Sequence, residues 1–326
     1  LIKSQSKAYI EEFVKEEKIK NSNIIEIHNR PTYLLYLIKE KINSKFILYF
    51  HNDPLTMRGS KTINERIFLI KNCSKIVFNS QWSKKRFLNN IQNRYYNSEK
   101  LIIIYQSALK QKINFKNKKK WITFVGKLNK AKGYDIFGKA IIRILNKYPK
   151  WKALVIGDER RESMIFKHKN LKLFGFQTHN KVLNTFKSSS IAVVCSRWDE
   201  PLGRTSLEAS SNGCAVIISN KGGLPETITN GIILKNLNEN ELFNEIDFLI
   251  KNAKIRKEYQ KLSNKNFVHT NKKSSKEVDH YRDQLFNTKK FIPKVIKKLE
   301  SLRILHITNF NERHDGRLFF NTGRRI

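Results

Sequence analysis

Residues 198–226 read WDEPLGRTSLEASSNGCAVIISNKGGLPE. This segment holds two carboxylates, Glu200 and Glu208, with Gly203 between them, followed by an apolar run and a glycine turn. The order is typical of a loop that leaves a buried strand and enters a helix, where main-chain amides can hold an anionic ligand. Two carboxylates at this spacing also occur on ordinary solvated helices. At this point two interpretations stay open, a ligand site and a pair of surface charges.

Apolar runs of strand length alternate with segments of helical periodicity on both sides of this segment. Strands are predicted at 24–28, 46–50, 75–79, 101–105, 121–125, 153–156, 171–174, 191–195, 215–219 and 232–234. Helices are predicted at 4–20, 33–42, 63–71, 82–91, 239–252, 255–267 and 276–286, and others between the later strands. Such alternation requires crossover connections and parallel sheets. We therefore predict an α/β protein with doubly wound domains.

The polar, Lys-rich segment 111–120 interrupts the alternation and predicts a linker. It separates a domain at 1–110 from a domain at 121–290, and a second linker is predicted at 291–301. Residues 303–309 read RILHITN, like the first strand of a new unit, so we expect a truncated further domain at 302–326. The alternative is a C-terminal strand added to the second domain. Since Leu1 lies just before a helix, we expect a fragment of a longer protein.

The chain is strongly basic, with 64 Lys and Arg against 28 Asp and Glu and a formal net charge of +36. This charge favours an anionic partner, such as nucleic acid, an anionic membrane or a phosphorylated substrate. The basic residues are spread along a chain rich in Lys, Asn and Ile, so compositional bias is the stronger explanation. The cysteines 73, 195 and 214 lack metal-ligand spacing and indicate a reducing compartment. No apolar run is long enough to span a bilayer, and we predict a cytoplasmic protein.

A second junction of the same kind reads GKLNKAKG at residues 126–133, directly after the strand predicted at 121–125. Lys127 is expected just after the strand and Lys132 just before a helix. Two cations beside helix-terminal amides can hold a diphosphate and stabilise charge on a leaving phosphate. The alternative is a solvated loop in a Lys-rich protein.

Together the two junctions resemble retaining glycosyltransferases of family 4. Residues 200–226 resemble that family's donor-site signature, Glu-Pro-x-Gly-x4-Glu followed by a strand and Gly-Gly-x-Pro-Glu. Residues 124–133 resemble its phosphate-binding segment. The resemblance implies the GT-B fold, in which two Rossmann-like domains face each other across a cleft. The family's N-terminal strand and glycine-rich loop have no counterpart before Leu1. We therefore expect an incomplete first domain, and a polypeptide that by itself is inactive or poorly folded in that domain.

The resemblance also implies a role for each matching residue. Glu200 would contact the hydroxyls of the donor sugar, and Glu208 the ribose of the nucleotide. Lys127 stands where the family usually has Arg, and because an ammonium cannot form the two-pronged contact of a guanidinium, its hold on the diphosphate is weaker. Arg204 stands where the family usually has an apolar residue. The implied donor-binding residues are Lys127, Lys132, Gly126, Gly203, Arg204 and Glu208, and the implied catalytic residues are His51 and Glu200.

In the first domain, Tyr49-Phe50-His51 resembles the family's strand-end His, which lies near the reacting sugar and the acceptor. Without the resemblance, a His beside Asn52 and Asp53 is a capped turn. The segment 28–31, HNRP, ends another strand at the same edge and has a weaker functional case.

The resemblance implies a hexosyltransferase that takes a nucleoside diphosphate sugar and needs no metal or other cofactor, and the sequence has no Asp-x-Asp. The expected acceptor is an envelope glycan, such as lipopolysaccharide, or a lipid-linked molecule. The basic and aromatic segment 82–87, with 94–96, is compatible with contact with an anionic membrane at its cytoplasmic face. The alternative is an amphipathic helix that covers the sheet.

Three other functions are alternatives for this sequence. A sugar-nucleotide epimerase would use the same fold, so the fold cannot exclude it. A phosphorylase would carry a pyridoxal phosphate Lys motif that this sequence lacks. A basic nucleic-acid-binding protein would cluster its Lys and stacking residues, whereas here they are dispersed.

Overall fold

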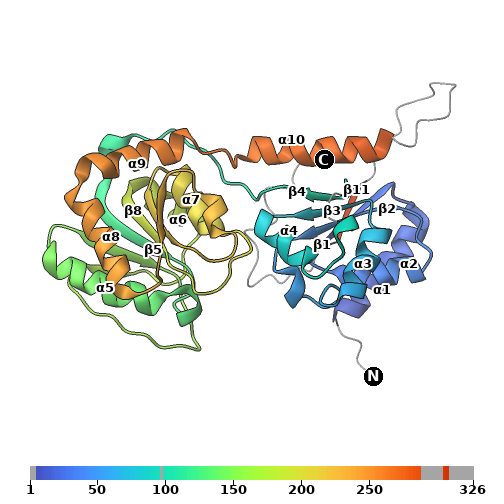
Figure 1. Cartoon of the computed structure of the whole chain (residues 1–326), viewed down its shortest axis with the longest axis horizontal. Coiled ribbons are helices and arrows are strands. Elements are labelled where there is room, and N and C mark those ends of the chain that lie inside the picture. Colours follow the sequence, from blue (N-terminus) through green and yellow to red (C-terminus); the bar gives the residue numbers. More distant parts are fainter. Residues whose placement is uncertain (1–4, 96–97, 288–303, 308–326) are drawn as a thin grey trace. The chain divides into compact units, whose positions relative to one another are not determined.

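The computed structural model describes residues 5–95, 98–287 and 304–307. The chain forms two compact units, each built on a parallel β-sheet with helices around it (Figure 1). The first unit contains Leu1–Tyr105 and Ser274–Ile326, and the second contains Gln106–Lys273. Two units with this architecture confirm the predicted α/β class with two Rossmann-like domains.

The first sheet has the strand order β11-β1-β2-β3-β4, and all neighbouring strands are parallel. Its strands are β1 (Ile24–His28), β2 (Lys45–Phe50), β3 (Lys75–Phe78), β4 (Leu101–Ile103) and β11 (Ile304–Ile307). Helix α1 (Gln5–Lys20) precedes β1, and α2 (Pro31–Lys39), α3 (Ile63–Asn72) and α4 (Gln81–Leu88) follow β1, β2 and β3 in turn. Every residue of β1 is buried, since a parallel sheet is covered on both faces and its strands are nearly continuous apolar runs.

Side chains at the helix starts explain where α3 and α4 begin. Before α3, the Glu65 amide donates to the Thr62 hydroxyl at 3.2 Å, and the Thr62 amide donates to the Glu65 carboxylate at 2.9 Å. Before α4, the Ser80 hydroxyl accepts from the Ser83 amide at 2.9 Å. These contacts satisfy amides that have no partner within the helix, so the helices start where the sequence provides a cap.

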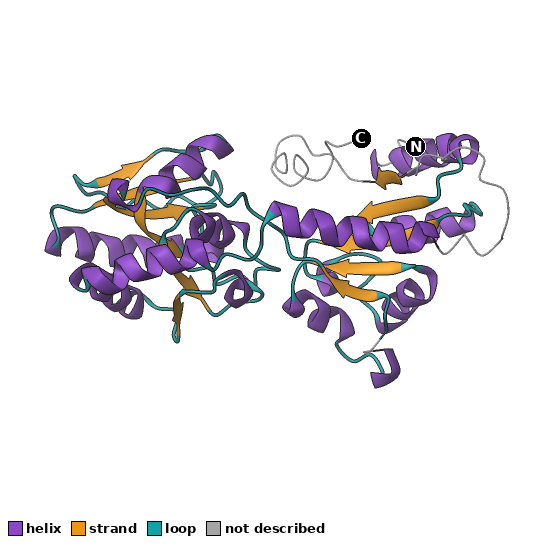
Figure 2. Ribbon diagram, turned by 90° about the horizontal axis from the view of Figure 1, so that it is seen from above, coloured by secondary structure: helices purple, strands orange, loops and turns teal. Residues whose placement is uncertain are grey.

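One face of the first sheet is covered by a helix from the far end of the chain, α10 (Asn271–Asn287). Val278, Tyr281 and Leu285 on this helix pack against Ile24 and Ile47 in the sheet. Figure 2 shows the helix running along the strands of this unit. The chain therefore leaves the first unit after β4, builds the second, and returns to complete the first core.

The second sheet has the order β10-β9-β8-β5-β6-β7, again with parallel neighbours. Its strands are β5 (Lys119–Val125), β6 (Lys152–Ile156), β7 (Leu171–Leu173), β8 (Ser189–Val194), β9 (Ala215–Ser219) and β10 (Gly231–Leu234). Its helices are α5 (Tyr134–Lys147), α6 (His179–Ser188), α7 (Arg204–Ser211), α8 (Glu239–Lys251) and α9 (Ala253–Lys265). Chain order reverses between β5 and β8, and ligands of such sheets bind outside the strand ends at this point.

The unit boundaries differ from the predicted domain boundaries. The first boundary lies between Tyr105 and Gln106 rather than at 110, and the second between Lys273 and Ser274 rather than at 290. Apolar periodicity locates a helix such as α10 but does not tell which sheet it covers. Residues 304–307 pair in parallel with β1, rather than standing apart as a new domain or joining the second sheet. The expected linker at 291–301 lies outside the described residues.

A buried carboxylate on α8 gives a prediction for acid stability. Burial alone would raise the pKa of Asp247, but hydrogen bonds from Lys147, Lys251 and Tyr148 lower this pKa to about 2. A carboxyl whose pKa is depressed by folding stabilises the fold above its unfolded pKa of roughly 4, and loses this effect as the pH falls toward the folded value. Asp247→Asn is therefore expected to reduce the free energy of unfolding at pH 7 by about 2 kcal/mol.

Urea denaturation at pH 7 and at pH 3 measures this difference, with Glu258→Gln on the exposed side of α9 as the control. The difference between Asp247→Asn and the unsubstituted protein should shrink at pH 3, whereas the control should change little at either pH. An equal deficit for Asp247→Asn at both pH values would show that its charge contributes nothing.

Candidate functional site

The loop after β5 carries the predicted phosphate-binding segment and is folded by its own side chains. Asn129 caps the short turn Lys130–Lys132, since its side-chain oxygen accepts from the Lys132 amide at 3.0 Å. Gly133 follows in the left-handed conformation, with φ of 71°, and α5 begins at the next residue. A Cβ atom at Gly133 would lie 1.9 Å from the Cys195 carbonyl oxygen. Only glycine allows the loop to approach the end of β8 this closely.

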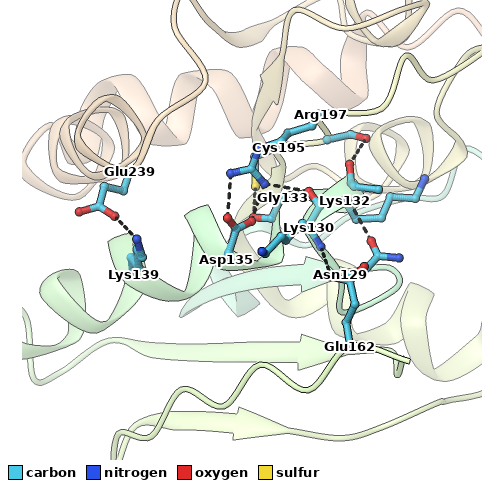
Figure 3. Close-up of polar contacts among 12 residues, drawn as sticks. Asn129, Lys130, Lys132, Gly133, Asp135, Lys139, Glu162, Cys195, Arg197 and Glu239 are labelled. Carbon is cyan, nitrogen blue, oxygen red and sulfur yellow. Dashed lines mark hydrogen bonds and ion pairs between the residues drawn. The ribbon is translucent and has the colours of Figure 1, made fainter. Parts of the chain in front are cut away.

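The loop after β5 is bound to the loop after β8, because these two strands are neighbours in the sheet. The amides of Arg197 and Trp198 donate to the Ala131 carbonyl at 2.9 and 3.0 Å. The Arg197 guanidinium donates to the Lys130 carbonyl at 2.8 Å and forms a fork on the Asp135 carboxylate at 2.5 and 2.8 Å (Figure 3). Both loops are therefore held in one arrangement.

This arrangement brings together two residues that lie far apart in the sequence. The Lys132 ammonium forms an ion pair with the Glu200 carboxylate. The Lys132 side chain is 34% exposed and that of Glu200 is 12% exposed, so solvent reaches the cation more readily than the carboxylate. A cation and a carboxylate at the carboxyl ends of adjacent strands can contact a phosphate and sugar hydroxyls, respectively.

The glycine turn in the segment 222–226 holds Glu200 in place. The Gly223 amide donates to the Glu200 carbonyl at 2.6 Å. A Cβ atom at Gly222 would lie 2.2 Å from that same oxygen, and one at Gly223 would lie 2.4 Å from the Pro201 carbonyl oxygen. The paired glycines thus let the chain after β9 pack against the loop that carries Glu200.

Glu208 lies on α7 and is 7% exposed. Its carboxylate contacts His179 Nε2 at 3.0 Å and the Arg204 guanidinium at 3.3 Å. Gly203, with φ of 105°, precedes the first residue of this helix. The carboxylate therefore contacts an imidazole from α6 and a guanidinium from its own helix, α7.

His179 is a residue that the sequence reasoning missed. The signal for it is the polar run Gln177-Thr178-His179-Asn180, which follows the end of β7 at the same edge of the sheet as the other loops. Lys127, in contrast, is exposed on the loop after β5, next to Gly126. The structure brings Lys132 together with Glu200, and Arg204 with Glu208.

His51 lies in the first unit, directly after β2, and is held by the ends of both neighbouring strands. Its amide donates to the Asn29 side-chain oxygen at 2.7 Å, and its carbonyl accepts from the Asn79 side chain at 3.0 Å. Its Nε2 atom lies 3.0 Å from Nδ1 of His28. Its Nδ1 atom is buried as well, so the protein encloses the imidazole on both nitrogen edges.

The basic segment that suggested membrane contact is largely occupied with internal contacts. Arg86 forms a fork on Asp53 at 2.8 to 3.2 Å and lies over the ring of Trp82. The Lys84 ammonium donates to the Leu101 carbonyl at 2.9 Å. These contacts favour the interpretation of α4 as a helix that covers the sheet.

The described residues contain neither a metal-binding cluster nor a helix that could span a membrane. In residues 5–95, 98–287 and 304–307, no group of three or more His, Cys, Asp or Glu side chains is placed to hold a metal ion. In the same part of the chain, no helix is both long and apolar enough to cross a membrane.

Comparison with solved structures defines the class of fold. HepE of Anabaena, solved in complex with UDP-glucose, has a TM-score of 0.67 at 16% identity, with 84% of this chain and 82% of that chain covered. A glycosyltransferase of Rickettsia africae has a TM-score of 0.67 at 21% identity, over 88% of this chain and 84% of that one. The fold is that of the GT-B class.

Sequence comparison matches the second unit to a family model. The sequence model of Glycosyl transferases group 1 matches residues 106–266, which is nearly all of the second unit. The putative glycosyltransferase YtcC of Bacillus subtilis is 23% identical over 72% of this chain, and the spore coat protein SA of the same organism is 24% identical over 66%. The chain spans 65% and 64% of the lengths of these two relatives. The second unit therefore matches the model of Glycosyl transferases group 1 over nearly its whole length.

Proposed function

We propose that the protein transfers a hexosyl unit from a nucleoside diphosphate sugar to an acceptor hydroxyl, with retention at the anomeric carbon, as in family 4. The observation that carries this proposal is the ion pair between Lys132 and Glu200, in a unit that matches the model of Glycosyl transferases group 1. HepE, which shares the fold, was solved with UDP-glucose, and this supports a nucleotide sugar as the donor.

When the donor binds, it would separate Lys132 from Glu200, and each of the two residues would contact a different part of the donor. The Lys132 ammonium would turn to the diphosphate and stabilise the charge that develops as it leaves. Glu200 would then accept hydrogen bonds from sugar hydroxyls, and Glu208 from the ribose. Lys127 and the main-chain amides near Gly203 would add to the phosphate contacts. Because these groups supply the positive charge, the proposed reaction needs no metal ion.

The proposed acceptor is an envelope glycan or a lipid-linked precursor, reached at the cytoplasmic face of the membrane. Names of relatives support this proposal, since they include a spore coat protein and a protein in the cps region of Klebsiella pneumoniae. The lipopolysaccharide outer core galactosyltransferase WaaB shares the fold, with a TM-score of 0.56. The buried thiols of Cys73, Cys195 and Cys214 suit a reducing compartment.

Thermal unfolding of this chain with a panel of nucleotide sugars tests the proposal. A ligand at 100 times its Kd adds about 2.7 kcal/mol to stability, so the matching donor should raise the Tm by several degrees. The matching free nucleoside diphosphate should also raise it, while the free sugar should not. Chelator should leave the shift unchanged. If no member of the panel changes the Tm, the donor site proposed here is wrong.

A further inference from the structure

A line of polar side chains crosses the face of the first sheet that α10 covers. Glu26 and His28 lie on one face of β1 because they are two residues apart, and Tyr49 lies opposite His28 in the parallel register with β2. Arg282 reaches this line from α10. Polar groups in such a buried position require specific partners. Together with His51, these residues form what we call the β1–β2 polar line.

The line begins with a buried ion pair. The Arg282 guanidinium donates to both oxygens of the Glu26 carboxylate, at 2.8 and 2.7 Å, and Glu26 is fully buried. The Tyr49 hydroxyl donates to the same carboxylate at 3.0 Å. Burial, followed by the charge of Glu26, raises the pKa of Tyr49 well above its usual value, so the hydroxyl keeps its proton. These contacts fix the position of the Tyr49 ring.

The line continues through stacked rings. The His28 ring lies on the Tyr49 ring with centroids 4.4 Å apart and an angle of 11° between the planes. The His28 and His51 rings are tilted by only 4°, and their facing nitrogens are 3.0 Å apart. Two facing ring nitrogens at this distance share one proton, because one must donate and the other must accept. The tautomers of His28 and His51 are therefore coupled, because the facing nitrogen of one ring donates only when that of the other accepts.

We propose that His28 is a positioning residue for His51, and that it holds this imidazole in one tautomer and one orientation at the end of β2. The Arg282–Glu26–Tyr49 part of the line keeps His28 in place. The role in turnover rests on the proposed function, and on the family resemblance, which implies that His51 lies near the reacting sugar. The effect of His28 on the His51 tautomer does not rest on it and can be measured without a substrate.

The experiment uses the full chain labelled with 15N at histidine. Two-bond 1H–15N spectra report which nitrogen of each imidazole is protonated. His51→Ala identifies the signals of that ring. The variants are His28→Ala and His28→Asn, whose amide can restore a hydrogen bond to His51. The control is His280→Ala, an exposed His on α10.

We expect one tautomer of His51 in the unsubstituted protein and in the control, and a mixture in His28→Ala. With the donor found by thermal unfolding, His28→Ala should lower kcat by roughly 10- to 100-fold with the donor KM changed less than about twofold. His28→Asn should recover at least part of that loss. A purely structural role predicts a lower Tm without a change of tautomer.

The proposal is overturned if His51 keeps one tautomer in His28→Ala, or if kcat stays at the level of the control. It is also overturned if His51→Ala has normal turnover, because then there is no reacting group to position. If no nucleotide sugar binds, the proposed function fails by itself, and the spectra still decide whether His28 sets the His51 tautomer.

Discussion

Lys132→Ala should lower kcat/KM for the sugar nucleotide by about 10²- to 10³-fold, the range seen when one preorganised group that stabilises developing charge is removed. The structure gives the reason, because Asn129, Ala131 and Gly133 hold the turn so that this ammonium meets Glu200. Alanine removes the cation that the diphosphate requires and leaves Glu200 largely buried without it.

The matched control for this prediction is Lys130→Ala, two residues away in the same turn. Lys130 makes its contacts to Glu162 and Arg197 through main-chain atoms, and these survive the substitution. Steady-state kinetics of both variants, with the Tm of each, separate loss of the charge from loss of the fold. The assignment of Lys132 fails if the two variants have equal kcat/KM.

Gly133→Ala should reduce kcat/KM by about 100-fold or more, because displacement of catalytic groups by 1 Å can cost that much. The new Cβ atom would lie 1.9 Å from the Cys195 carbonyl oxygen, and the residue would keep a φ of 71° that an L side chain rarely adopts. The nearest atoms that the new Cβ would meet belong to the main chain of Cys195, which cannot move aside as a flexible side chain can. The turn must move, and Lys132 moves with it.

Gly175→Ala provides the comparison, since Gly175 has nearly the same backbone conformation, with φ of 64°, but no atom within 4 Å of the new Cβ. It should cost only about 1 to 2 kcal/mol of stability from its backbone conformation. Melting curves and kinetics of both variants test the close approach of the two loops. Similar kinetics for both would mean that the loops accommodate the extra atom.

Much of the fold could be predicted because it is encoded locally. The predicted strands at 24–28 and 215–219 have the observed bounds of β1 and β9, since continuous apolar runs mark buried parallel strands. The bounds of the helices were predicted less accurately than those of these strands. The structure begins α2 at Pro31 and not at Tyr33, because Pro is favoured in the first turn.

The candidate site was predicted in part, for a similar reason. Glycines and charged residues at strand ends identify the loops at 126–133 and 200–226, and their neighbouring strands β5 and β8 bring the loops together. His179 was missed because the sequence does not show that the start of α6 approaches Glu208 on α7. Membrane contact was one of two interpretations of the basic residues of α4, and the structure shows Arg86 paired with Asp53.

The sequence by itself determined the strands, most helices and the residues at the ends of β5 and β8, because apolar period and glycine position are local properties. Only the tertiary structure decided which of these residues meet. Glu26 and Arg282 are separated by 256 positions, and nothing in the local pattern of either residue names the other. A buried carboxylate requires a cation but does not specify where in the chain it comes from. That choice was made by the return of α10 to the first sheet.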